Sequence, residues 1–269
     1  MSEHEFVKGL LGLIAFFVAL FYGVMPFLIL FTVRMAPRKG LESFDPDDPE
    51  LLDQFTGQAK GARRRLEELG FETLTGIFAP SIASNVKAVL VTLIDRRTCD
   101  FATIVMAFVR DPATGNWKFH RQFLTCFTKY RDGSVVATRN AKDLSSFPPR
   151  PNSTTYSLPS VKSASRLIAI HQCAKRRHHG SEPILRHEVE FRGDLLEYFA
   201  VSSEEEMSDA IEAGYLRELQ DGVYRPTLKG AFLMTWKELW PWKWLRQLRV
   251  KALEKQLLNE LADELPSEA

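Results

Sequence analysis

The chain has 269 residues, of which 45% are hydrophobic and 26% are charged, a balance that is ordinary for globular proteins. A chain of this length forms about one or two domains. The 35 Lys and Arg residues nearly balance the 34 Asp and Glu residues, so the composition excludes a wholly basic nucleic-acid binder, although not a local basic patch. The three cysteines, Cys99, Cys126 and Cys173, are too few and too far apart for a disulfide framework or a paired-cysteine metal site.

Residues 9–33 form an uncharged apolar run of 25 residues near the N-terminus. A helix needs about 20 residues to cross the hydrocarbon core, so the run predicts a single transmembrane helix. A cleaved signal peptide is the alternative, but its apolar part is usually about 7–15 residues long and follows a basic start. Here Glu3 and Glu5 precede the run. Pro26 predicts a kink, and Tyr22 and Pro26 are candidates for contact with a partner helix, unless the Tyr22 hydroxyl bonds its own backbone.

Basic residues flank the apolar run unequally. Lys8 precedes it, whereas Arg34, Arg38 and Lys39 follow it. Because the more basic flank stays in the cytoplasm, we expect an inner-membrane protein with its N-terminus outside and its large C-terminal part in the cytoplasm. The absence of a cysteine framework is consistent with such a reducing compartment.

A linker at residues 34–48 precedes the first predicted helix of the soluble part. Asp47 or Asp48 is expected as its N-cap, with Pro49 in the first turn and Gly70 after its end. Its apolar residues recur every three or four positions, which indicates one buried face: Leu51, Leu52, Phe55, Ala59, Ala62, Leu66 and Leu69. The arginines at 63–65 either face solvent or reach anionic lipid.

Strand signals follow this helix at short intervals. The predicted strands are residues 71–78, 86–94, 101–109, 117–130 and 134–139. Short polar turns, including Asp132-Gly133, join them and favour an antiparallel meander. Residues 147–160 read as a Pro/Ser/Thr connector, and a helix is expected near 161–175. Helices without βαβ alternation predict an α+β domain at 49–178.

The last third has a different pattern. It begins with a strand-like segment at 184–191 and a helix at 195–201. Ser202 or Ser203, together with Glu206, forms a capping box that predicts a second helix at 204–213.

A turn, a short strand and a capped helix come next. The Asp221-Gly222 turn, the strand at Tyr224 and the Thr227 cap resemble the wing and exit helix of winged-helix domains. The resemblance implies a small, mostly helical module at 181–235. Its acidic residues would repel phosphate, so we do not expect nucleic-acid binding; they are Glu204, Glu205, Glu206, Asp209 and Glu212.

Residues 236–258 are rich in tryptophan and basic residues and predict one amphipathic helix, followed by an acidic tail at 259–269. Four of the five tryptophans lie here, and this pattern is typical of a membrane interface with anionic lipid. The alternative is that these tryptophans pack on the preceding domain. The predicted membrane-interface residues are Arg34, Arg38, Lys39, Trp236, Trp240, Trp242, Trp244, Lys243, Arg246 and Arg249.

Motifs that carry chemistry are absent from the sequence. It has no GxGxxG, Walker lysine loop, GxSxG or HExxH, so no catalytic residue, cofactor or metal is predicted. The His and Cys residues at 171–187 are accompanied by basic residues, which oppose a cation. His120, Arg121 and Arg139 are the candidates for lining a pocket beneath the sheet.

These patterns favour a non-enzymatic, single-pass membrane protein whose cytoplasmic part binds a protein partner, as an accessory or scaffold subunit of a membrane assembly. One alternative is an anchored enzyme or ligand-binding domain with a pocket between sheet and helices. Another is a membrane-tethered winged-helix regulator that binds nucleic acid. The predicted segments are a flank at 1–8, the anchor at 9–33, the linker at 34–48, the α+β domain at 49–178, the module at 181–235, the amphipathic helix at 236–258 and the tail at 259–269.

Overall fold

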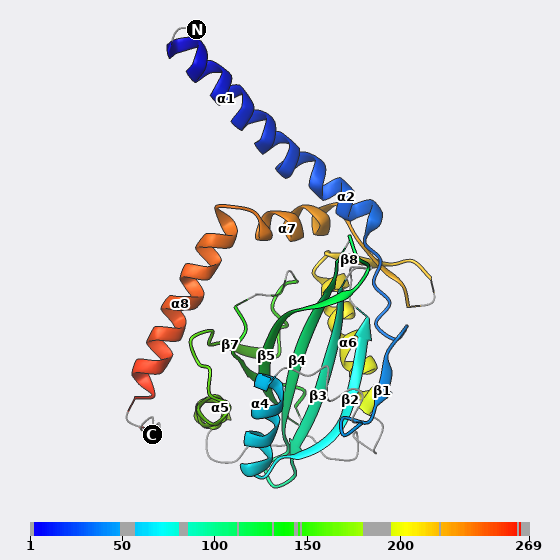
Figure 1. The fold of residues 1–269 in the computed structure, drawn as a ribbon, viewed down its shortest axis with the longest axis vertical. Coiled ribbons are helices and arrows are strands. Elements are labelled where there is room, and N and C mark those ends of the chain that lie inside the picture. The colour runs from blue at the N-terminus through cyan, green and yellow to red at the C-terminus, as the bar shows by residue number, and fades with distance from the viewer. Residues whose placement is uncertain are drawn as a thin grey trace. The chain divides into compact units, whose positions relative to one another are not determined.

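The computed structural model describes residues 3–48, 57–80, 86–111, 113–130, 132–142, 145, 147–179, 195–220, 222–262 and 264. The chain forms two compact units (Figure 1). The anchor unit comprises Met1–Ala36, Ser145–Pro148 and Glu205–Arg246. The sheet unit comprises Pro37–Leu144, Pro149–Glu204 and Gln247–Ala269.

The sheet unit is built on a seven-stranded sheet in which sequence order and spatial order coincide. Its strands are β1 (Glu42–Phe44), β2 (Glu72–Pro80), β3 (Val86–Asp95), β4 (Asp100–Arg110), β5 (Trp117–Lys129), β6 (Val135–Arg139) and β7 (Ser153–Ser157). Neighbours from β1 to β6 are antiparallel, whereas β6 and β7 are parallel. The predicted α+β class is therefore confirmed, and the five predicted strands are present as β2 to β6.

The sheet is mixed, so the prediction of a purely antiparallel meander is wrong at its edge. β7 lies inside the segment 147–160 that we predicted as a connector. Its sequence STTYS has no apolar run, and the strand is half-buried, so hydrophobic patterning does not detect it. β1 has only three residues and lies in the predicted linker.

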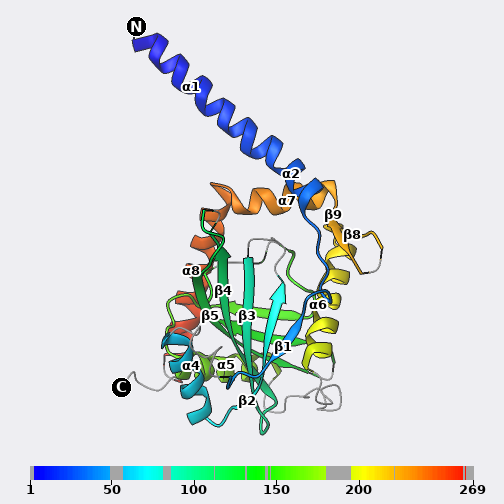
Figure 2. The same ribbon diagram turned by 45° about the vertical axis from the view of Figure 1, so that its right-hand side comes forward.

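Helices α4 (Gly57–Glu68) and α5 (Ala164–His179) pack beside the sheet (Figure 2). Leu66 of α4 and Leu167 of α5 are fully buried in one hydrophobic cluster with Leu93, Ile104 and other strand residues. Gly70 ends the first helix with a φ of +94°, the left-handed conformation that glycine adopts readily. The predicted start of this helix, residues 49–56, lies outside the described residues.

Helix α6 (Leu195–Glu212) is a single helix, so the two helices predicted at 195–201 and 204–213 are one. Ser202 and Ser203 lie in its interior and cap nothing, because no Gly or Pro interrupts the chain there. The strand predicted at 184–191 lies outside the described residues.

The N-terminal helix of the anchor unit consists of α1 (Glu3–Ala19), a π-helical turn η1 (Leu20–Val24) and α2 (Met25–Thr32). The 29-residue stretch His4–Thr32 is long and apolar enough to cross a membrane. The π turn ends two residues before Pro26, where the missing N–H removes an α-helical hydrogen bond. A backbone irregularity therefore occurs where Pro26 predicted a kink.

The remainder of the anchor unit contains the hairpin of β8 (Leu216–Glu218) and β9 (Tyr224–Pro226), followed by α7 (Leu228–Glu238). Thr227 caps α7, as predicted, because its Oγ1 accepts from the Gly230 amide at 2.9 Å. Asp221, half of the predicted turn, lies outside the described residues, and Gly222 has a φ of +68°.

The single helix predicted at 236–258 is divided into α7 and α8 (Trp242–Glu260). Leu239 is extended and ends α7. Two residues later Pro241 lacks an amide donor and disfavours helix at Trp240, so the helix does not continue through this segment. The start of the predicted acidic tail is ordered. Glu260 and Glu264 pair with Arg177 and Arg176 of α5 at 2.8 and 3.0 Å.

Candidate functional site

The end of the anchor helix is held by α7 of the same unit. The indole Nε1 of Trp236 donates to the carbonyl oxygen of Tyr22 at 3.3 Å. Tyr22 stands four residues before Pro26, so this carbonyl is the one that an amide at position 26 would bind in an α-helix. Phe232 contacts both Phe27 and Trp236 edge-on, with ring centroids 5.7 and 5.5 Å apart.

Arg225 and Met35 secure the segment at the end of the helix. The Arg225 Nε donates to the Leu30 carbonyl at 2.7 Å, and its guanidinium lies 5.3 Å from the centre of the Phe31 ring. Met35 and Tyr224 exchange two backbone hydrogen bonds of 3.0 and 2.7 Å. Met35 and Tyr224 also belong to the hydrophobic core of the anchor unit. We call this group of contacts the anchor junction.

The junction gives Tyr22 and Pro26 a partner within their own chain. Pro26 is buried, and the polar contact at Tyr22 is made by its backbone carbonyl. These two residues, predicted as contacts for a partner helix, therefore lie against α7. Trp236 is partly covered by the same contacts.

The other predicted interface residues differ in their surroundings. Trp240 is 76% exposed, and Trp242 and Trp244 are each about half exposed. Arg249 and Lys39 are exposed, and Arg34 donates to the neighbouring Val33 carbonyl.

Several predicted interface cations form ion pairs. Arg38 pairs with Glu197 and Glu204. Lys243 and Arg246 pair with Glu238 at 3.2 and 3.6 Å.

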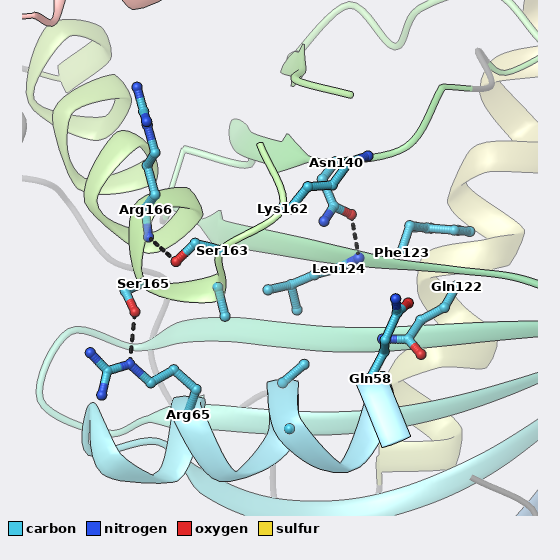
Figure 3. Close-up of a pocket in the computed structure, with 13 residues that line it drawn as sticks. Gln58, Arg65, Gln122, Phe123, Leu124, Asn140, Lys162, Ser163, Ser165 and Arg166 are labelled. Carbon is cyan, nitrogen blue, oxygen red and sulfur yellow. Dashed lines mark hydrogen bonds between the residues drawn. The ribbon is translucent and has the colours of Figure 1, made fainter. Parts of the chain in front are cut away.

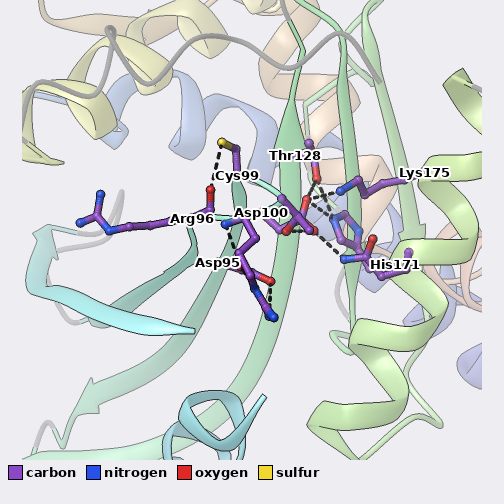
Figure 4. Close-up of polar contacts among 10 residues, drawn as sticks. Asp95, Arg96, Cys99, Asp100, Thr128, His171 and Lys175 are labelled. Carbon is purple, nitrogen blue, oxygen red and sulfur yellow. Dashed lines mark hydrogen bonds and ion pairs between the residues drawn. The ribbon is translucent and has the colours of Figure 1, made fainter. Parts of the chain in front are cut away.

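A cluster of buried polar side chains joins α5 to the sheet (Figure 4). Asp100 at the start of β4 accepts from Lys175 Nζ at 2.6 Å and from Gln172 Nε2 at 2.6 Å. Thr128 of β5 also donates to Asp100, and its Oγ1 lies 3.0 Å from Nε2 of His171. We call Asp100, Thr128, His171, Gln172 and Lys175 the Asp100 cluster.

Proton counting fixes the tautomer of His171. Thr128 has one hydroxyl proton and gives it to the carboxylate, so His171 Nε2 must donate to Thr128. His171 Nδ1 is then an acceptor, and it has no hydrogen-bond partner among the described residues. Burial lowers the pKa of His171 to about 4 and Lys175 adds to this, although the Asp100 carboxylate opposes it.

Asp100 remains ionised in this cluster. Burial opposes its charged form, but the charge of His171 when it is protonated, the charge of Lys175 and the hydrogen bonds from Lys175 and Thr128 outweigh burial and lower the pKa of Asp100. Asp100 and His171 are fully buried, so a substrate has no direct access to them. The cluster therefore serves to fix α5 on the sheet.

Two thiols, Cys126 and Cys173, are also buried. Burial, with a contribution from Asp100, raises the pKa of the Cys126 thiol and keeps it protonated. Cys173 is buried beside Arg176, and His187 lies outside the described residues. Within the described residues, no three His, Cys, Asp or Glu side chains come together as metal donors.

A cavity of about 990 Å³ lies between α4, β5 and the start of α5 (Figure 3). Among the described residues that line it, three are cationic and none is acidic. The lining residues are Gln58, Gly61, Ala62, Arg65, Gln122, Phe123, Leu124, Asn140, Lys162, Ser163, Ala164, Ser165 and Arg166.

His120, Arg121 and Arg139, the pocket candidates from the sequence, are not among these lining residues. His120 and Arg121 are exposed on β5, and Arg139 donates to Ser157 Oγ at 3.0 Å. We did not predict the cavity from the sequence. The polar and basic run Lys162-Ser163-Ala164-Ser165-Arg166 at the start of α5 is the signal that could have indicated it.

Comparisons with protein-family models, with curated proteins and with solved structures give no match to this chain. Function must therefore be argued from the anchor junction, the Asp100 cluster and the cavity.

Proposed function

We propose that the chain is a non-enzymatic, single-pass inner-membrane protein whose cytoplasmic part binds a protein partner as an accessory or scaffold subunit of a membrane assembly. The observation that carries the proposal is an apolar helix with exposed side chains, His4–Thr32, whose end is held to a folded module by Trp236 and Arg225. A soluble protein rarely leaves such an apolar surface uncovered, whereas lipid or a membrane partner would cover it.

The proposed orientation places the N-terminus outside and the C-terminal part in the cytoplasm. Arg34, Arg38 and Lys39 follow the helix, whereas only Lys8 precedes the apolar run at 9–33. Protease treatment of intact spheroplasts tests this with a tag at either end of the full chain. We expect loss of the N-terminal tag and protection of the C-terminal tag; digestion of the C-terminal tag in intact spheroplasts contradicts the orientation.

The connection between α7 and α8 and the first turns of α8 are proposed to lie at the membrane–water interface. Trp240, Trp242 and Trp244 are exposed there beside Lys243 and Arg246, and α7 packs on the end of the anchor. Amphipathic tryptophan rings favour the headgroup region, and the cations are attracted to anionic lipid. If these three rings were exposed only to water, no contact would offset the free-energy cost of hydrating their apolar surface.

Fluorescence quenching by brominated lipid tests the interfacial segment. The full chain in lipid nanodiscs should be quenched, and quenching should persist in Trp117→Phe, since Trp117 lies on β5. Quenching should fall when Trp240, Trp242 and Trp244 are all replaced by Phe. Equal quenching in both variants contradicts the interfacial placement.

The hairpin and capped helix are proposed to form a winged-helix-like module that recognises protein. In this proposal, residues 205–212 of α6 correspond to the helix, the β8–β9 hairpin to the wing and α7 to the exit helix. The acidic residues of α6 include Glu205, Glu206 and Asp209, which disfavour a nucleic-acid partner.

The partner is tested by extracting the tagged full chain from its host in a mild detergent, followed by sizing and mass spectrometry. A matched control replaces residues 9–33 with an unrelated transmembrane helix of equal length. A stoichiometric membrane protein that co-elutes with both the native chain and the control binds the cytoplasmic part. A protein that co-elutes with the native chain but not with the control binds residues 9–33. Both results support the proposal. A native chain that elutes alone contradicts it.

A further inference from the structure

We propose that the cavity between α4, β5 and α5 binds a phosphate-bearing ligand, a site separate from the anchor junction. Its volume of about 990 Å³ is at the upper end of the range for small-molecule sites, roughly 300–1,000 Å³. Figure 3 shows Arg65 on α4, Lys162 just before α5 and Arg166 in the first turn of α5, with the Arg166 side chain directed away from α4.

The charge of the cavity selects the class of ligand. The described lining residues include Arg65, Lys162 and Arg166 and no carboxylate. Gathering like charges around a hollow costs free energy unless an anion or solvent screens them. Glu68, which does not line the cavity, already pairs with Arg65 at 2.7 Å and balances part of this positive charge. A phosphate would add favourable contacts with these cations, whereas a bound cation would be repelled by them.

The donors of two of these side chains are only partly used by the protein. Arg65 donates from Nε to Ser165 Oγ at 2.8 Å and from Nη1 to Glu68 at 2.7 Å, which leaves Nη2. Lys162 Nζ makes one hydrogen bond, to the Pro159 carbonyl at 2.8 Å. An ammonium has three donors, so two of them can reach a ligand.

The uncharged lining residues also present donors. Asn140 Oδ1 accepts from the Leu124 amide at 2.7 Å, so its side-chain NH₂ group is left to face the cavity. The first turn of α5, a helix of 16 residues, adds backbone amides that have no intrahelical acceptor. Ser163 caps this turn by accepting from the Arg166 amide at 3.4 Å. Cations, amide donors and helix amides together match the oxygen-rich surface of a phosphate.

Titration of the full chain in phosphatidylcholine nanodiscs with pyrophosphate and with ATP tests the proposal. We expect saturable binding of at least one probe, measured by calorimetry at constant ionic strength. Lys162→Gln should weaken binding by about tenfold, because one charge-assisted hydrogen bond is lost. Lys162 is exposed, so this variant should fold normally.

Arg64→Gln is the matched control, since its side chain is 84% exposed on the same helix as Arg65 and does not line the cavity. It should leave the affinity unchanged. The proposal is overturned if Lys162→Gln and Arg64→Gln weaken binding equally. It is also overturned if neither probe binds saturably and anionic lipid gives no exchange protection.

Hydrogen exchange distinguishes the two sources of phosphate. If the natural ligand is a lipid headgroup, discs that contain phosphatidylglycerol should protect the first amides of α5 without any added probe. If it is a soluble phosphate compound, these amides should be protected only when pyrophosphate or ATP is added. Both patterns support a phosphate-binding cavity, and neither depends on the protein partner proposed above.

Discussion

Trp236 donates its indole proton to the carbonyl of Tyr22, the carbonyl that Pro26 leaves without an α-helical donor. A side chain of α7 thus donates to a carbonyl of the N-terminal helix that lacks its usual donor because Pro26 has no N–H. A backbone carbonyl left without a donor is costly wherever water cannot reach it. The contact links the irregular turn of the anchor to the folded module beside it.

Trp236→Phe should destabilise the anchor junction by about 1 kcal/mol, because it removes the hydrogen bond and keeps most of the ring packing. Pro26→Ala restores an amide that can bind the Tyr22 carbonyl. In the Pro26→Ala background, Trp236→Phe should therefore cost close to nothing. A double-mutant cycle of thermal unfolding in detergent measures this coupling. Equal costs in the two backgrounds would show that the indole contributes packing alone.

Lys175→Met should strongly destabilise the sheet unit, by about 3 kcal/mol or more, because it leaves Asp100 buried without its cation. The matched control is Lys118→Met, since the Lys118 side chain is 67% exposed where it pairs with Asp111 at 2.5 Å. An ion pair whose cation stays in water contributes about 1 kcal/mol or less. Chemical unfolding of both variants in detergent gives the comparison, and similar losses would contradict the assigned role of the Asp100 cluster.

Stability should fall as the pH is lowered from about 6.5 to about 4. His171 stays neutral in the folded protein until its lowered pKa of about 4, whereas the unfolded chain takes up the proton near 6.5. The unfolded state therefore binds more protons in this window, and the stabilisation present above pH 6.5 is lost on acidification, by roughly 3 kcal/mol. The pKa of Asp100 is also lowered, so its own contribution is lost at still lower pH.

His171→Gln checks this assignment, because Gln can keep a donor toward Thr128 and has no proton to gain. Thermal unfolding of the native chain and the variant should be compared across this pH range. The native midpoint should decline more steeply than that of the variant. Parallel declines would assign the acid sensitivity to other groups.

Hydrophobic patterning in the sequence predicted the central strands because their residues are apolar and buried. Val86–Asp95 and Asp100–Arg110 are such strands, each bounded by polar turns. It missed β7, whose Ser and Thr residues form a strand only because β6 offers a free edge. A local pattern cannot reveal a partner strand that is distant along the chain.

The sites depend on contacts that local sequence does not encode. Trp236 and Tyr22 are 214 positions apart, and Lys175 and Asp100 are 75 positions apart. From the local sequence alone, Asp100 is interpreted as a turn residue and Trp236 as a membrane-interface residue. Their contacts with Lys175 and Tyr22 are visible only in the tertiary structure. Pro241 is the contrary case, since its effect on the predicted helix at 236–258 is local and could have been anticipated.

Gly230→Ala should destabilise the anchor unit because a Cβ at this position would lie 1.9 Å from the Tyr215 carbonyl oxygen. The contact is with backbone, so relief requires α7 to move away from the segment before β8, and we expect a loss of about 1–3 kcal/mol. Gly61→Ala in α4 is the control, since nothing lies within 4 Å of its added Cβ. This change should stabilise the helix by up to about 1 kcal/mol. Thermal unfolding of both variants measures the difference, and a neutral Gly230→Ala would show that α7 is free to shift on the hairpin.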